Sequence, residues 1–135
     1  ILFDGVEEGI SIDEAAAWPQ RGVLLDARAP ERYRGESEPF DPVAGHIPGA
    51  VNLPADAVLD GASFAPPATI RAAFESVGVS DLTSVAAYCG SGLTAAHTAL
   101  AGAAAGLDVA VYPGSWSQWS NTAGRPVATG AEPGA

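Results

Sequence analysis

The sequence has one cysteine, no lysine and no methionine, and each shortage removes a class of protein. A lone Cys89 cannot form an internal disulfide, which excludes a disulfide-stapled extracellular scaffold and a cysteine-rich zinc site. The absence of lysine excludes a Schiff-base lysine and a phosphate-loop lysine. Because all six basic residues are arginine, an anionic ligand must be held by arginine or by backbone N–H groups. A native start codon would supply a methionine, so we expect a fragment of a longer protein or a trimmed tag.

Long apolar runs and positive charge are also scarce. No stretch approaches the ~18 apolar residues of a membrane-spanning helix, and no cationic flank precedes an apolar N-terminal segment. The formal net charge is -10, whereas binding to phosphate backbones needs basic surface. We therefore expect a cytoplasmic protein with no nucleic-acid partner and no membrane partner. Its 135 residues suffice for one domain with its own core.

Apolar runs alternate with segments of helical periodicity, which predicts an α/β domain with a mainly parallel sheet. Ser11 and Glu14 have capping-box spacing, so a short helix should begin there and end at Pro19. A second short helix should run from Pro30 to a stop at Gly35. Longer helices are expected over residues 66–77 and 93–105, a helical turn over 114–119, and strands over 23–28, 50–53, 84–89 and 109–114.

The remaining segments are rich in glycine and proline. Residues 36–48 should form an ordered loop. Residues 1–10 are predicted to be a lead-in or linker, residues 11–128 the folded domain, and residues 129–135 a C-terminal tail that ends a Gly/Pro/Ala-rich segment. No internal repeat is visible.

Cys89 lies where an expected strand ends, before Gly90, Ser91 and Gly92 and an alanine-rich helix. A tight turn that opens a helix leaves backbone N–H groups unpaired and directed at the turn. A thiol held there ionises more easily, and the thiolate is the attacking form. The alternative is a small buried hydrophobe. The two glycines favour a site, because they let a ligand approach the backbone closely.

Other charged residues should reach the same edge of the sheet. Ligands of parallel α/β sheets bind beyond the carboxyl ends of the strands. Asp26, Arg28 and Cys89 all follow or close such strands. Their common position supports a site at this edge.

Four blocks, DARAPERYRG, GHIPGAVNLP, YCGSGLTAAH and YPGSWSQW, resemble the rhodanese domain in order and spacing. They are most similar to the catalytic C-terminal half of tandem-domain thiosulfate and 3-mercaptopyruvate sulfurtransferases. The resemblance covers about residues 11 to 128. It implies a three-layer domain with helices on both faces of the sheet, and a missing N-terminal rhodanese domain that would supply part of the donor pocket. It also implies a six-residue active loop, comprising Cys89, Gly90, Ser91, Gly92, Leu93 and Thr94.

The resemblance also implies a persulfide on Cys89. The thiolate would take the outer sulfur of a small anionic donor and pass it to cyanide or to a thiol acceptor such as thioredoxin. The amides of residues 90 to 94 would stabilise negative charge on sulfur, as in an oxyanion hole. Neither a metal nor an organic cofactor is required.

Substrate-binding residues follow from the same resemblance. Thiosulfate-preferring members carry cationic residues directly after the cysteine, whereas this chain has Gly90 and Ser91, similar to the 3-mercaptopyruvate class. In that class the serine at the position of Ser91 is proposed to assist proton movement. The alternative is that the Ser91 hydroxyl only forms a hydrogen bond with a backbone group of the loop. Arg32 matches the arginine that binds the donor's anionic end. Arg28 is a second candidate, with a structural pairing to Asp26 as the favoured alternative. Many mercaptopyruvate enzymes have another arginine where this chain has Phe40.

The histidines and tryptophans are expected to be structural. His97 lies eight residues beyond Cys89, about 12 Å along a helix, too far to be its base. His46 should organise its loop by bonding backbone groups. Trp116 and Trp119 should close the core, although Trp116 could also flank the pocket.

Two other functions compete. A cysteine phosphatase needs an arginine six positions after the cysteine, in a longer loop, and this chain has Ala95 there. A cysteine protease needs a histidine within reach of the thiol. The remaining alternative is a regulatory rhodanese module that needs a second domain for activity. The retained Cys89 and its loop favour catalysis.

Overall fold

The computed structural model describes residues 9–60 and 63–134 and has a four-stranded parallel sheet at its centre. The strand order is β2-β1-β5-β6. Leu25 at the centre of β1 pairs with Val51 on one side and with Ala87 on the other. The strands are β1 (Val23–Asp26), β2 (Val51–Asn52), β5 (Val85–Tyr88) and β6 (Val109–Val111). The predicted α/β class and parallel sheet are therefore confirmed.

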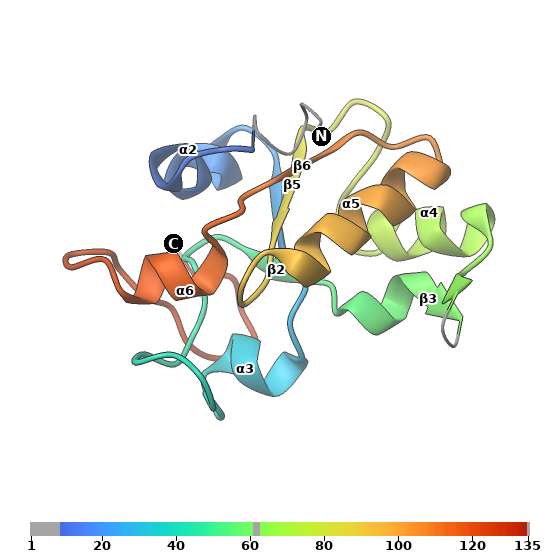
Figure 1. The fold of residues 1–135 in the computed structure, drawn as a ribbon. Helices are drawn as coiled ribbons and strands as arrows, with labels where there is room; N and C mark the ends of the chain where they lie inside the picture. The colour runs from blue at the N-terminus through green and yellow to red at the C-terminus, as the bar shows by residue number, and fades with distance from the viewer. Residues whose placement is uncertain (1–8, 61–62, 135) are drawn as a thin grey trace.

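Helices cover both faces of this sheet (Figure 1). Successive strand residues point to opposite faces, so Leu24 packs in one core with Trp116 and Trp119, whereas Leu25 packs in the other with Phe74. On the first face lie α2 (Ile12–Ala17), a 3-10 turn (Trp18–Gln20) and α6 (Ser115–Ser120), and on the second lie α4 (Pro67–Glu75) and α5 (Leu93–Ala104). This arrangement is the three-layer domain that the family resemblance implied.

Local signals placed the short helices correctly. Ser11 and Glu14 form the predicted capping box at the start of α2. α3 (Pro30–Arg34) begins at its proline and ends at Gly35. Gly35 has a φ of 82°, a left-handed conformation that an L side chain disfavours. α3 lies at the carboxyl edge of the sheet, where a site was expected (Figure 1).

Three small elements after β2 were not predicted. A 3-10 turn (Ala55–Val58) leads into β3 (Leu59–Asp60), which pairs antiparallel with β4 (Ser63–Phe64). Each of these strands is two residues long, too short to show the alternation that identifies a strand in a sequence. Residues 1–8 of the expected lead-in lie outside the described part of the chain. In the described ranges, no helix combines the length and hydropathy needed to cross a bilayer.

Between α6 and residue 134 the chain has no helix or strand, but its backbone is hydrogen-bonded to the domain. His46 and Ala128 exchange two backbone hydrogen bonds, and Gly49 donates to the Pro133 carbonyl at 2.8 Å. The predicted C-terminal tail, residues 129–135, thus contacts the domain through Pro133. Its Gly/Pro/Ala composition carried no sign of these contacts, because they join backbone groups distant in the sequence.

Buried tyrosines predict a loss of stability in alkali. Burial raises the pKa of Tyr33 and of Tyr112 to about 12, and Tyr33 donates its hydroxyl hydrogen to the Ala50 carbonyl at 2.5 Å. A raised pKa means that the folded state holds its proton after the unfolded state has lost it. The free energy of unfolding should therefore fall between pH ~10 and ~12, by up to ~1.4 kcal/mol per pH unit for each tyrosine.

Urea unfolding curves from pH 8 to pH 11.5 would measure this loss. Tyr33→Phe should reduce the slope at high pH, although it also removes the hydrogen bond to Ala50 and so lowers stability at pH 8. A slope identical in the wild type and in Tyr33→Phe would contradict the role of Tyr33.

Candidate active site

Cys89 follows β5 directly, and its sulfur faces the start of α5. The residue is buried, with 3% of its surface exposed. Its Sγ accepts hydrogen bonds from the backbone N–H of Gly92 at 3.0 Å and of Ala95 at 3.3 Å. Two such donors stabilise negative charge on the sulfur. Gly92 belongs to the loop predicted to supply these amides, whereas Ala95, in the first turn of α5, was not foreseen.

The turn between Cys89 and α5 requires glycine at position 92. Gly92 has a φ of 99°, and a Cβ there would lie 2.6 Å from the carbonyl oxygen of Pro113. A side chain would therefore face both a strained backbone and a backbone clash that cannot relax easily. The backbone of Gly92 therefore lies close against Pro113, in the segment between β6 and α6.

The first turn of α6 fixes the cysteine backbone. The Oγ of Ser115 accepts from the Cys89 N–H at 3.1 Å and donates to the Tyr112 carbonyl at 2.9 Å. The N–H groups of Trp116 and Ser117 donate to the carbonyls of Cys89 and Gly90, both at 2.9 Å. Ser115 has a φ of 54°, unusual for a residue other than glycine. Its supporting role was not predicted, because nothing in its immediate sequence separates it from a helix cap.

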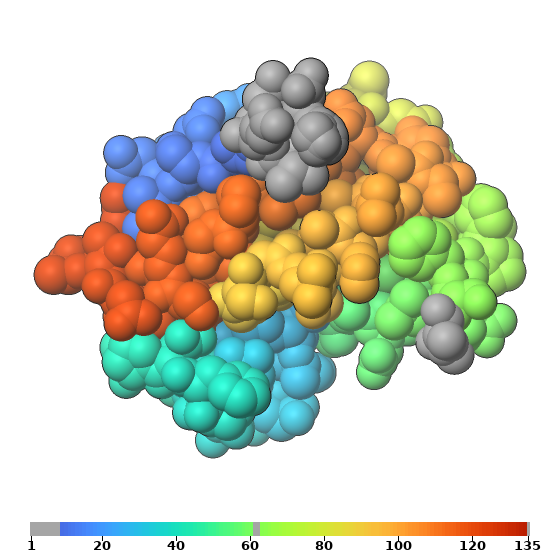
Figure 2. Space-filling view, viewed as in Figure 1, coloured from blue at the N-terminus to red at the C-terminus, as the bar shows by residue number. Residues whose placement is uncertain are grey.

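Cys89 opens into a pocket of about 270 Å³. The gold loop after β5 meets the segments before and after residue 40, in cyan and teal, and α6 in orange-red on one face of the molecule (Figure 2). The pocket is lined by Arg32, Phe40, Asp41, Cys89, Gly90, Ser91, Thr94 and Ser117. It thus gathers the predicted Arg32, Cys89, Gly90, Ser91 and Thr94 and adds Phe40, Asp41 and Ser117. Gly92 and Leu93, also predicted, are not among its lining residues.

Arg32 reaches the cysteine loop from α3. A Cβ at position 90 would lie 3.3 Å from its Nη2 and 3.4 Å from its Nη1, so Gly90 leaves room for the guanidinium. Nη2 donates to Oε2 of Glu38 at 3.0 Å and lies 3.7 Å from Oδ2 of Asp41. The guanidinium also lies over the ring of Phe40, 5.3 Å from its centroid. Arg32 is therefore placed where a cation for an anionic donor was expected.

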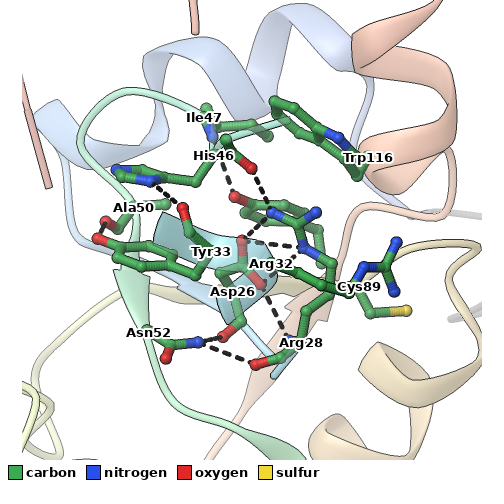
Figure 3. A network of polar contacts seen from close by, with 12 residues as sticks. Asp26, Arg28, Arg32, Tyr33, His46, Ile47, Ala50, Asn52, Cys89 and Trp116 are labelled. Atoms are coloured by element: carbon green, nitrogen blue, oxygen red, sulfur yellow. Dashed lines mark hydrogen bonds and ion pairs between the residues drawn. The ribbon is translucent and has the colours of Figure 1, made fainter. Parts of the chain in front are cut away.

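Arg28 is buried beside Asp26 (Figure 3) and does not line the pocket. Its guanidinium donates to Asp26 through Nη2 at 2.7 Å and through Nε, and Nη2 also donates to the Gly45 carbonyl. Burial alone would lower the pKa of Arg28, but the hydrogen bond and charge of Asp26 outweigh it and raise that pKa. This placement favours the structural pairing with Asp26 over contact with substrate.

The histidines lie outside the pocket. His46 is fully buried, and its ring nitrogens face two carbonyls, Tyr33 at 2.7 Å and Pro133 at 3.0 Å. It thus organises its loop, as predicted. His97 is exposed on α5. Trp116 is buried and does not flank the pocket; its Nε1 donates to the Val43 carbonyl at 2.8 Å.

No metal centre accompanies the thiol in the described ranges. Within residues 9–60 and 63–134, no three His, Cys, Asp or Glu side chains come together in a way that could hold a metal ion. The groups available at the pocket are the sulfur, backbone N–H groups, the hydroxyls of Ser91, Thr94 and Ser117, one guanidinium and one carboxylate. This set suits sulfur chemistry on a small anion.

Comparison with known proteins agrees with this geometry. The profile of the Rhodanese-like domain matches residues 11–122. The "Putative thiosulfate sulfurtransferase SseB" of Mycobacterium tuberculosis is 48% identical over 133 residues, which are 96% of this chain and 47% of that protein. The "Probable 3-mercaptopyruvate sulfurtransferase" of Pseudomonas aeruginosa is 43% identical over 136 residues, covering 92% and 46% of the two chains. The chain thus spans about half the length of these relatives.

Solved structures share the fold. The Tum1 protein of Saccharomyces cerevisiae superposes with a TM-score of 0.80 at 23% identity, over 94% of this chain and 48% of that one. The anaerobic ergothioneine biosynthesis enzyme of Chlorobium limicola gives 0.82 at 26% identity, over 91% and 32% of the two chains.

Proposed function

Since this chain belongs to the Rhodanese-like domain family, we propose that it is a sulfurtransferase domain that carries sulfur as a persulfide on Cys89. The observation that supports this most directly is the pair of backbone N–H donors on the Cys89 sulfur. They can stabilise the thiolate before attack and the persulfide after it. Arg32 lies beside the same loop, where its guanidinium can bind the anionic end of a donor.

The proposed reaction has two balanced halves. The Cys89 thiolate attacks the thiol sulfur of 3-mercaptopyruvate, the sulfur–carbon bond breaks, and its electrons form the enolate, which takes a proton to give pyruvate. Cyanide or a thiol such as that of thioredoxin then attacks the outer sulfur of the persulfide, and the Cys89 thiolate leaves. Ser91 lines the pocket and can pass a proton during the first half.

The loop supports 3-mercaptopyruvate over thiosulfate as the preferred donor. Gly90 and Ser91, the two residues after the cysteine, carry no charge. The chain matches relatives named for thiosulfate and relatives named for 3-mercaptopyruvate, so both donors should be tested side by side. We place the activity in the cytoplasm, in line with the single cysteine.

A regulatory module that needs a second domain is the other candidate. The chain spans about half of its relatives, and Phe40 lines the pocket with 79% of its surface exposed. An N-terminal rhodanese domain packed over Phe40 would complete the donor pocket. In that case the isolated domain would turn over either sulfur donor slowly.

Mass measurement tests the persulfide. The protein, incubated with each donor without an acceptor, should gain one sulfur atom, and cyanide should remove it. The modified peptide should contain Cys89. No gain with either donor, in this domain and in a chain that includes the preceding domain, would refute the sulfurtransferase proposal.

Replacing Arg32 with alanine should weaken donor binding. The variant loses a charge-assisted contact worth ~1.5–3 kcal/mol, so the KM for 3-mercaptopyruvate should rise roughly 10- to 100-fold. Steady-state kinetics would measure it. Arg34→Ala is the matched control, because Arg34 lies on the same helix and pairs with Glu36 at the surface. An unchanged KM in Arg32→Ala would remove Arg32 from the donor site.

A further inference from the structure

The carboxylate of Asp41 is held in the wall of the pocket in an arrangement that folding alone does not explain. Its Oδ1 accepts from the Ser117 hydroxyl at 3.0 Å. Its side chain is 8% exposed, and its buried Oδ2 has no hydrogen-bond partner, only an ion-pair contact of 3.7 Å with Nη2 of Arg32. Buried carboxylate oxygens are normally hydrogen-bonded, since leaving one without such a bond disfavours the folded state. The position of Asp41 beside Cys89 and Arg32 points to a role in the site.

The cations at this edge of the sheet are outnumbered by carboxylates. Arg28 pairs with Asp26 and Glu38, and Arg32 pairs with Glu38 and Asp41. Two guanidinium groups therefore face three carboxylates. An anion that enters the pocket meets an Arg32 that is already paired with carboxylates, and one negative charge in excess.

Asp41 is the carboxylate of this cluster that lines the pocket. Glu38 holds the loop instead, because its Oε2 accepts from the backbone N–H groups of Phe40 and Asp41 at 3.2 and 3.1 Å. Asp26 is enclosed with Arg28. The charge of Asp41 is thus the one that an incoming donor senses most strongly, and its removal leaves the loop contacts of Glu38 in place.

We propose that Asp41 is a specificity-determining residue that makes the pocket around Cys89 discriminate against doubly charged sulfur donors. This inference rests on the proposed sulfur transfer. Thiosulfate carries two negative charges and, on losing its outer sulfur to Cys89, leaves as sulfite dianion. The carboxylate of 3-mercaptopyruvate carries one charge, and its thiol sulfur is neutral. Because Coulomb repulsion scales with ligand charge, Asp41 disfavours thiosulfate twice as strongly in free energy.

The test is Asp41→Asn, which keeps an oxygen to accept from Ser117 and removes the charge. We expect kcat/KM to rise about tenfold for thiosulfate and about threefold for 3-mercaptopyruvate, since the factor for a dianion is the square of that for a monoanion. Glu36→Gln is the control: it removes one charge from the same loop, but Glu36 pairs with Arg34 at the surface, so neither donor should respond. Equal factors for the two donors, or no change with either, would overturn the proposal.

A second measurement separates this inference from the proposed function. Iodoacetate and iodoacetamide alkylate a thiolate in the same way, forming a sulfur–carbon bond with loss of iodide, but only iodoacetate is an anion. The rate of Cys89 alkylation by iodoacetate, divided by the rate with iodoacetamide, should rise about threefold in Asp41→Asn and stay unchanged in Glu36→Gln. A ratio that does not rise refutes the role of Asp41 even if both donors load Cys89. A ratio that rises while neither donor loads Cys89 refutes the proposed function alone.

Discussion

Replacement of Cys89 by alanine should abolish sulfur loading and lower kcat/KM by at least ~10³-fold with either donor, because no other thiol exists in the chain. The pocket would keep Arg32 and its backbone donors, but these groups cannot form a covalent bond to sulfur. Mass measurement after incubation with donor, and cyanide-dependent turnover, would show the loss.

The fold should survive this change. Cys89 packs in the core on the α5 side of the sheet, and a change from cysteine to alanine removes a single heavy atom there. Far-ultraviolet circular dichroism and the urea midpoint would therefore stay close to those of the wild type. Cys89→Ser, which retains an atom at the Sγ position, should be equally inactive. Substantial residual turnover in both variants would mean that sulfur moves without a persulfide on the protein.

The second large effect is on stability and concerns Asp26. Its carboxylate accepts from the Arg28 backbone N–H at 2.9 Å and from the guanidinium at 2.7 Å, and both side chains are 1% exposed or less. Asp26→Ala would leave a buried guanidinium without its main partner. We expect the free energy of unfolding to fall by ~3–5 kcal/mol, measured by urea denaturation.

An exposed ion pair supplies the control. Asp13 pairs with Arg125 across a surface where the Asp13 side chain is 85% exposed, so Asp13→Ala should cost at most ~1 kcal/mol. Asp26→Asn, which keeps one acceptor oxygen, should fall between the two. If Asp26→Ala and Asp13→Ala cost the same, the Arg28 network is not a main support of the carboxyl edge of the sheet.

The centre of the site could be predicted because its signals are local. The strand before Cys89, the glycines after it and the alanine-rich helix lie within sixteen residues, and each has a known backbone preference. Arg32 was assigned from the family resemblance, and the structure places it in the pocket.

The second wall of the pocket could not be predicted in this way. Asp41 and Ser117 are 76 positions apart and meet only because the loop before β2 folds against α6. Neither lies in a periodic pattern that would reveal a partner. Likewise, Ser115 supports Cys89 from 26 positions away, through a backbone N–H that any residue carries.

The chain beyond α6 has a consequence for where this folding unit can be cut. The family match ends at residue 122, yet the His46 N–H donates to the Ala128 carbonyl, the His46 carbonyl accepts from the Ala128 N–H, and Gly49 donates to Pro133. A protein shortened to the family boundary would expose these polar groups and the aromatic stack of Tyr33 on His46, whose centroids lie 3.8 Å apart. A protein made for expression or crystallisation should therefore retain residues up to 134. The last segment then keeps its hydrogen bonds to the loop that holds His46 and Gly49.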